Sequence, residues 1–166
     1  MIKIELLEEK HLTDRVKMLN DPEVTKYLNV HEHFTLEKTI EWYKNRNISK
    51  RYDYVFIHDN SIIGMGGLTN VSTVNSNAEL YLYLSTEFQG KGFGFVSFVE
   101  LCKMGLLTLN LHKLYSYTFA LNVRINRIHE KIGFKHEGTL REHTYKNGIL
   151  NDRYIYGLLK SEFKYL

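Results

Sequence analysis

Residues 78–109 pass from a strand pattern through a glycine-rich loop into a helix pattern. "AELYLYLS" (78–85) alternates, with leucines on one face and Glu79, Tyr81 and Tyr83 on the other, which predicts a strand. "FQGKGFGF" (88–95) then has glycine at positions 90, 92 and 94. Beyond it, apolar residues recur at helical spacing: Phe95, Phe98, Val99, Cys102, Leu106 and Leu109. The loop therefore faces the unpaired N–H groups at the start of a helix.

The start of such a helix favours a negatively charged ligand. Its free N–H groups combine with a macrodipole equivalent to about half a positive charge. Glycines at 90, 92 and 94 let a phosphate approach the amides without meeting a Cβ. The spacing is that of neither a Walker A loop nor the dinucleotide fingerprint. From the glycines alone, a pyrophosphate site and an ordinary glycine-rich turn both remain open.

The patterns along the whole chain give one order of elements. A strand at 1–7 precedes a helix at 12–19, a helix beginning at Pro22 after the cap Asp21, and a helix at 35–45. Strands are predicted at 52–59, 62–71, 78–85 and 113–119, and a helix at 122–132 ends at Gly133. Two final strands flank the Asn147-Gly148 turn. This order predicts an α/β (α+β) fold in which residues 1–166 form a single domain.

Composition excludes several classes of protein. The net charge is +3 and no run of five like charges marks a nucleic-acid tail, so we expect no nucleic-acid partner. Cys102 is the single cysteine, which rules out a disulfide framework. No apolar run approaches membrane-spanning length and "MIKIELLEEK" lacks a signal-peptide core, so we expect a cytoplasmic protein with no membrane partner. His31, Glu32 and His33 are consecutive and make a poor chelate, so no metal is expected.

Two motifs and both ends of the chain resemble the GNAT N-acetyltransferase superfamily. Gln89–Gly94 matches the Q/R-x-x-G-x-G/A loop that binds the acyl-CoA pyrophosphate, and "NVRINRIHEKIGF" is similar to the second signature. "LNDPEVTKYL" and "EGTLREHTYKNGILNDRYIYGLLKSEF" resemble the branch that acetylates ribosomal-protein alanine or spermidine. The resemblance implies a mixed central sheet splayed between two strands, with helices on both faces. It also implies direct transfer of acetyl from acetyl-CoA to a primary amine, without a metal.

The resemblance assigns residues to acetyl-CoA. The backbone of Leu82, Tyr83 and Leu84 would pair with the pantetheine arm, and Asn122 would contact it or act only as a helix cap. Arg124, Arg127 and Lys131 recur at helical spacing and would meet the 3′-phosphate, or form a solvated basic face. The pyrophosphate loop consists of Gln89, Gly90, Lys91, Gly92, Phe93 and Gly94.

Two residues are candidates for proton transfer. Glu79 occupies the frequent glutamate position of the family and would take a proton from the acceptor ammonium; the alternative is a strand carboxylate in a salt bridge. Many relatives place a proton-donating tyrosine where this chain has His129. An imidazolium can donate a proton to a thiolate. However, Ile125, Ile128 and Ile132 surround His129 on the helix, which favours a histidine buried in the core. In that case water protonates the thiolate.

The acceptor is a small-molecule or peptide amine that the sequence does not identify. Glu32 and Glu41, with Glu37, would supply the carboxylates of a polyamine site, or would form a solvated helix face. Tyr81 would shape the acceptor pocket or pack as a core aromatic. An amino sugar and a protein N-terminus stay open as acceptors. A longer acyl-CoA stays open as the donor, and a homodimer stays open as the oligomeric state. The missing tyrosine also motivates a non-catalytic CoA-binding sensor as the alternative function.

Overall fold

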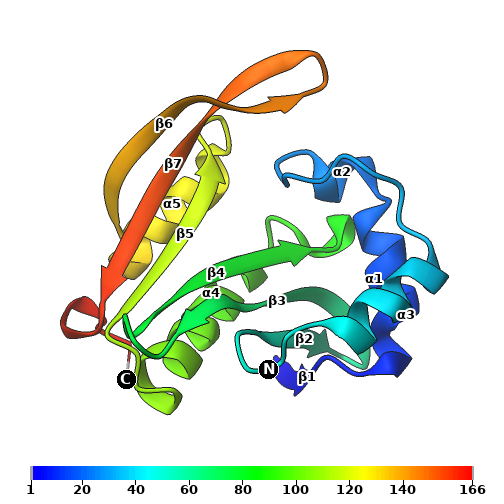
Figure 1. The fold of residues 1–166 in the computed structure, drawn as a ribbon, viewed down its shortest axis with the longest axis horizontal. Coiled ribbons are helices and arrows are strands. Elements are labelled where there is room, and N and C mark those ends of the chain that lie inside the picture. The colour runs from blue at the N-terminus through cyan, green and yellow to red at the C-terminus, as the bar shows by residue number, and fades with distance from the viewer. Residues whose placement is uncertain (1, 166) are drawn as a thin grey trace.

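Seven strands form one mixed sheet in the order β1-β2-β3-β4-β5-β7-β6 (Figure 1). This computed structural model describes residues 2–165. The structure confirms the predicted order of elements along the chain, and within the sheet only β4 and β5 run parallel as neighbours. The strands span β1 Lys3–Leu6, β2 Tyr52–His58, β3 Ser61–Ser72, β4 Asn77–Leu84, β5 Lys113–Phe119, β6 Lys135–Lys146 and β7 Ile149–Leu159.

The helices begin and end where the sequence places caps. Asp21 accepts a hydrogen bond from Glu23 N and precedes Pro22, and Gly133 ends the last helix with φ 112°. The second helix is shorter than its sequence suggested, because it ends after one turn at Thr25. The helices are α1 Leu12–Leu19, α2 Pro22–Thr25, α3 Leu36–Asn45, α4 Phe93–Lys103 and α5 Val123–Ile132, and a π-helical turn at Met104–Thr108 extends α4.

Helices cover both faces of the sheet, as expected. On one face, α4 and α5 pack over a core that includes Phe98, Cys102, Leu106 and Ile132. On the other face, α1, α2 and α3 cover a second cluster around Leu12, Val55, Met65 and Tyr83. The apolar stripe predicted after the glycine loop is thus a core surface of α4.

The sheet opens between β4 and β5. The two strands pair only through residues 77–79 of β4 and 113–115 of β5. Beyond this point each strand continues, and Figure 1 shows the two ribbons diverging. The divergence confirms the predicted splay and leaves backbone groups of both strands without a neighbouring strand.

The β6–β7 hairpin extends past the rest of the sheet toward α2 (Figure 1). Its turn consists of Asn147 and Gly148, whose φ angles are 52° and 80°, as the Asn-Gly pair predicts. At its tip, the Lys146 ammonium donates hydrogen bonds to the carbonyl oxygens of Thr25 and Leu28 in the segment after α2. The tip of the hairpin is therefore tied to the end of α2 and the segment that follows it. Within residues 2–165, no helix is long and apolar enough to span a membrane.

Candidate active site

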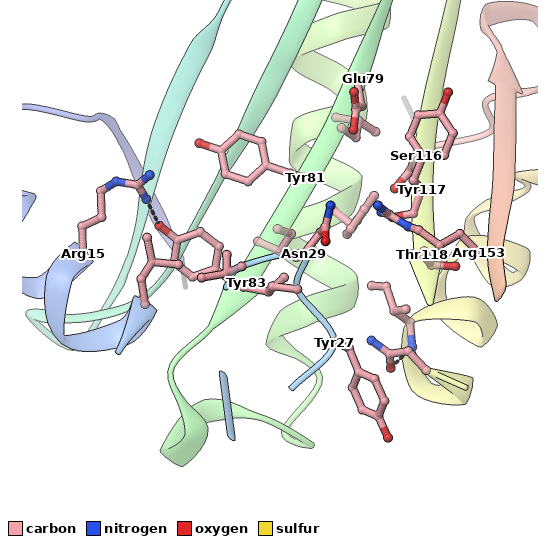
Figure 2. Close-up of a pocket in the computed structure, with 18 of the residues that line it drawn as sticks. Arg15, Tyr27, Asn29, Glu79, Tyr81, Tyr83, Ser116, Tyr117, Thr118 and Arg153 are labelled. Carbon is pink, nitrogen blue, oxygen red and sulfur yellow. Dashed lines mark hydrogen bonds between the residues drawn. The ribbon is translucent and has the colours of Figure 1, made fainter. Parts of the chain in front are cut away.

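A cavity of about 290 Å³ lies where β4 and β5 separate. Figure 2 shows Glu79, Tyr81 and Tyr83 of β4 on one side of it and Ser116, Tyr117 and Thr118 of β5 on the other. The start of α5, the segment around residues 27–34 and Arg153 of β7 complete its walls. The cavity thus joins the splay to the face of the sheet that α1, α2 and α3 cover.

The backbone of β4 presents hydrogen-bonding groups to this gap. Ser85 N–H donates to Ile63 O at 2.9 Å, so the backbone of Ser85 faces β3. Because backbone groups alternate along a strand, those of Leu82 and Leu84 face the gap. A peptide-like chain laid beside β4 finds donors and acceptors there, as strand addition requires. Leu84 O already accepts a hydrogen bond from Gln89 Nε2 at 3.1 Å.

The N-terminus of α4 has unpaired amides beside the end of β4. Gly90 and Gly92 have φ angles of 76° and 89°, the left-handed conformation that glycine adopts without strain. Gly92 O accepts from the N–H groups of Phe95 and Val96. The N–H groups of Gly92, Phe93 and Gly94 have no acceptor among residues 2–165. This loop fits an anion such as a pyrophosphate.

The three glycines of the loop differ in what surrounds them. A Cβ at Gly90 or Gly92 would have no atom within 4 Å, so the backbone conformation and the open approach explain these two. A Cβ at Gly94 would lie 3.4 Å from Ile128 Cδ1. Gly94 therefore faces α5, and a side chain methyl group there would make an ordinary van der Waals contact, so close packing does not require this glycine.

Basic side chains of α5 lie next to the glycine loop. Arg124 donates to Gln89 Oε1 at 3.4 Å, and the Lys131 ammonium lies 4.4 Å from the centre of the Phe95 ring. Arg127 lies between them on the exposed surface of the same helix, and Lys91 is exposed on the loop itself. The positive charges and the unpaired amides thus form one electropositive surface.

Glu79 lies at the point where the two strands part. It is the last residue of β4 that pairs with β5, opposite Tyr115. Its carboxylate lines the cavity, is half-buried and accepts from Asn70 Nδ2 at 2.9 Å. No basic side chain among residues 2–165 forms a salt bridge with it within 4.0 Å. The alternative prediction, a Glu79 carboxylate held in a salt bridge, is therefore not observed among these residues.

Tyr81 and Tyr83 line the cavity with their rings but use their hydroxyl groups elsewhere. Tyr81 OH donates to Asp53 Oδ1 at 2.5 Å. Arg15 Nη1 donates to Tyr83 OH at 2.6 Å, as Figure 2 shows. Asp53 also accepts two hydrogen bonds from Arg51 Nε. Burial raises the pKa of both phenols, so both stay neutral. The two tyrosines pack in the second core and also form a cavity wall, and the role of Tyr81 toward the acceptor stays a prediction.

His129 lies outside this cavity, in the core beneath α5. Its side chain is fully buried, and its ring stacks on Tyr156 at 4.9 Å between ring centres. Nδ1–H donates to Ile125 O at 2.9 Å, while Nε2 has no hydrogen-bond partner in the described chain. Burial lowers the pKa of the imidazole to about 4. The placement favours the core interpretation over proton donation to a thiolate.

The other predicted residues divide between two cavities and the surface. Asn122 caps α5 by accepting from Ile125 N at 3.4 Å and also lines the larger cavity, so it can serve both predicted roles. Glu32 lines a second cavity of about 250 Å³ between α1 and α3. Glu41 is exposed on α3 and lines neither cavity. Over residues 2–165, no group of three His, Cys, Asp or Glu side chains is arranged to hold a metal.

Sequence reasoning missed the guanidinium groups of the larger cavity. Arg15, Arg51 and Arg153 line it, whereas Glu79 is its one carboxylate among the described lining residues. Arg15 and Arg153 each have a buried Nε without a hydrogen-bond partner in the described chain. No local pattern marks these arginines, because they come from distant parts of the chain: Arg15 from α1, Arg51 from the residue before β2, and Arg153 from β7.

Comparison with known proteins identifies the family of the chain. The profile of the acetyltransferase (GNAT) domain matches residues 2–135. A putative ribosomal N-acetyltransferase of Bacillus subtilis is 29% identical over an alignment of 171 residues, which covers 98% of this chain and 93% of that protein. Spermidine N(1)-acetyltransferase of Escherichia coli K12 is 26% identical over 148 residues, with 89% and 80% covered.

Solved structures share the fold. Spermidine N-acetyltransferase of Vibrio cholerae, crystallised with CoA and spermine, superposes with a TM-score of 0.92 at 23% identity, over 97% of this chain and 96% of that one. The family match, the splayed sheet and the glycine loop point to the same conclusion. The chain belongs to the GNAT acetyltransferase family and is an acetyl-CoA-dependent N-acetyltransferase.

Proposed function

We propose that Glu79 accepts the proton of the acceptor amine in the cavity between β4 and β5. One observation supports this most strongly: Glu79 is the single carboxylate among the described residues lining that cavity, and it lies where the strands separate. An amine attacks a thioester only as the neutral base, so a carboxylate that takes the proton of the ammonium would accelerate the reaction. The hydrogen bond from Asn70 holds one carboxylate oxygen and leaves the other for the amine or an intervening water.

Acetyl-CoA would be held by two groups of backbone amides. The N–H groups of Gly92, Phe93 and Gly94 would bind the pyrophosphate, with Gln89, Gly90 and Lys91 forming the rest of the loop. The gap-facing backbone of Leu82 and Leu84 would pair with the pantetheine amides, with Tyr83 between them and Asn122 across the gap. When bound, acetyl-CoA supplies the thioester whose acetyl group is transferred.

Charge on α5 would complete this binding site. Arg124 and Lys131 contact the glycine loop and the start of α4, and Arg127 is exposed between them. A terminal phosphate that reaches this surface gains charge-assisted hydrogen bonds. We assign no proton transfer to His129 in this scheme, so the departing thiolate takes its proton from water.

The Glu79→Gln variant tests the proposal. The amide keeps the size of the side chain but cannot accept the proton. Release of free CoA thiol in the presence of an amine should fall by roughly 100-fold, the lower end of general-base effects. The dissociation constant of CoA, measured by calorimetry, should change by less than about twofold. The Glu87→Gln variant, exposed in the turn after β4, is the matched control. Equal rates in Glu79→Gln and wild type would remove Glu79 from the mechanism.

The acceptor is a small primary amine with one ammonium group at Glu79. Arg51 is paired with Asp53, so Arg15 and Arg153 are the lining guanidinium groups without a carboxylate in direct contact, and two such charges against Glu79 disfavour a polycation there. A polyamine is the second candidate, because two relatives are named spermidine acetyltransferases. A panel with spermidine, an amino sugar and a peptide amine separates these acceptors by their kcat/KM. We further propose that residues 1–166 act as one catalytic domain in the cytoplasm.

A further inference from the structure

Arg153 reaches from β7 into the space between β4 and β5, as Figure 2 shows. Its Nη2 donates to Tyr117 O at 3.1 Å, which fixes one end of the guanidinium above β5. The rings of Tyr117 and Phe119 lie 5.5 and 5.6 Å from its Cζ and support the guanidinium from below. The side chain is thus held in one place and is not free at the surface.

The guanidinium has more donors than the protein satisfies. Arginine has five N–H donors in a planar fork, and one bond to a carbonyl leaves most of them unused. Nε is buried without a partner among residues 2–165, and no carboxylate there lies within 4.0 Å of the group. Partial burial lowers the pKa of Arg153, although the group remains charged. A partly buried cation without a carboxylate in direct contact is costly, so a ligand that supplies one gains affinity.

Arg153 and Glu79 line the same cavity with opposite charges. Glu79 lies on β4 and Arg153 comes from the β5 side. They are too far apart for a direct salt bridge but close enough for the Glu79 charge to favour the charged form of Arg153. A ligand between them meets a carboxylate at one end and a guanidinium at the other. The cavity volume of about 290 Å³ admits a small molecule with both groups.

We propose that Arg153 determines acceptor specificity by binding an anionic oxygen group, a carboxylate or a phosphate, of the molecule whose amine lies at Glu79. The inference rests on the proposed role of Glu79 and extends it to the substrate class. The fork geometry of the guanidinium suits both kinds of group, because each offers two oxygens to parallel N–H donors. The acceptor is then an amino acid-like or amino phosphate-like molecule and not a polyamine.

The test compares amines that differ only in the anionic group. O-phosphoethanolamine is paired with ethanolamine, and β-alanine with β-alaninamide; spermidine completes the panel. Wild type should acetylate at least one anionic amine with a kcat/KM about tenfold or more above that of its neutral partner. The better of the two anionic amines identifies the group as phosphate or carboxylate.

Variants of Arg153 locate the effect. Arg153→Gln should abolish the preference, so that the kcat/KM values of the anionic amine and its neutral partner become about equal, whereas Arg153→Lys should retain part of the preference. Arg141→Gln, on the exposed part of β6, is the control. Equal kcat/KM values within both pairs, or a preference that survives in Arg153→Gln, would overturn the inference. It would also be overturned if spermidine were acetylated faster than both anionic amines, or if no amine in the panel were acetylated. Loss of CoA binding in wild type would instead refute the proposed function.

Discussion

At the scale of single residues, His129 shows how a motif position changes its role with its surroundings. The family resemblance directed attention to proton donation, while the apolar neighbours at 125, 128 and 132 directed it to the core. The structure places the ring among Phe98, Phe134 and Tyr156, away from the cavity. A buried neutral imidazole resists protonation, which makes His129 a determinant of stability at low pH.

Replacement of His129 by phenylalanine should flatten the pH dependence of stability. The folded-state pKa is about 4 and the unfolded value is near 6.5, so the unfolded chain binds more protons between these values. The contribution of the neutral His129 to the free energy of unfolding is therefore fully present above pH 6.5, and it falls by roughly 3 kcal/mol as the pH drops to 4. Denaturant unfolding of wild type and His129→Phe from pH 4 to 8 measures the difference.

The same variant separates structure from catalysis. Acetyl transfer at pH 7.5 should stay within about twofold of wild type, because the ring does not line the cavity. An unchanged pH slope of stability would contradict the burial argument. A large drop in kcat with normal CoA affinity would instead restore His129 to the reaction.

At the scale of elements, the junction of β4 and α4 shows what local pattern can predict. Alternation, the glycine loop and the apolar stripe predicted the strand, the turn and the helix, and all three lie where expected. These signals are local, because periodicity and φ preference act over a few residues. The position of Gly94 beside Ile128 was not predictable, since Ile128 belongs to a separate helix.

Gly92→Ala should weaken CoA binding about tenfold. The left-handed conformation of Gly92 costs an alanine roughly 1–2 kcal/mol, and the new Cβ would project into open space at the α4 amides. Gly148→Ala is the matched control, because Gly148 has a similar φ of 80° and equally open surroundings at the far hairpin turn. Both variants should lose similar stability, but only Gly92→Ala should raise the CoA dissociation constant in calorimetry. Equal CoA affinities in the two variants would place the pyrophosphate elsewhere.

At the scale of the whole molecule, contacts between distant segments complete the cavity. Lys146 at the hairpin tip bonds carbonyl oxygens after α2, and Leu28, Asn29 and Val30 of that segment line the cavity. The sequence predicted the hairpin and its Asn-Gly turn but could not predict this contact, because the partners are more than 100 residues apart. Arg15 and Arg153 escaped prediction for the same reason.

Lys146→Met should loosen the segment after α2. Without the ammonium, the carbonyl oxygens of Thr25 and Leu28 lose their donor while the apolar stem of the side chain is kept. The KM for the amine should rise about threefold to tenfold, the CoA affinity should stay unchanged, and amide hydrogen exchange at residues 26–30 should accelerate.

A second methionine variant controls for the loss of a charge. Lys135→Met removes an exposed ion pair with Glu162 at the opposite end of the hairpin. It should change neither the KM for the amine nor the hydrogen exchange at residues 26–30. Unaltered exchange at 26–30 in Lys146→Met would show that the hairpin does not hold this segment.

The central claim is that the α4 amides and the gap-facing backbone of β4 together hold acetyl-CoA. Isothermal titration of the full chain with CoA and, separately, with pantetheine tests it most directly, because pantetheine lacks the phosphates. The account predicts saturable CoA binding at least about 100-fold tighter than pantetheine binding, with the difference shrinking in Gly92→Ala. Equal affinities for the two ligands, or no saturation with CoA at millimolar concentration, would contradict it.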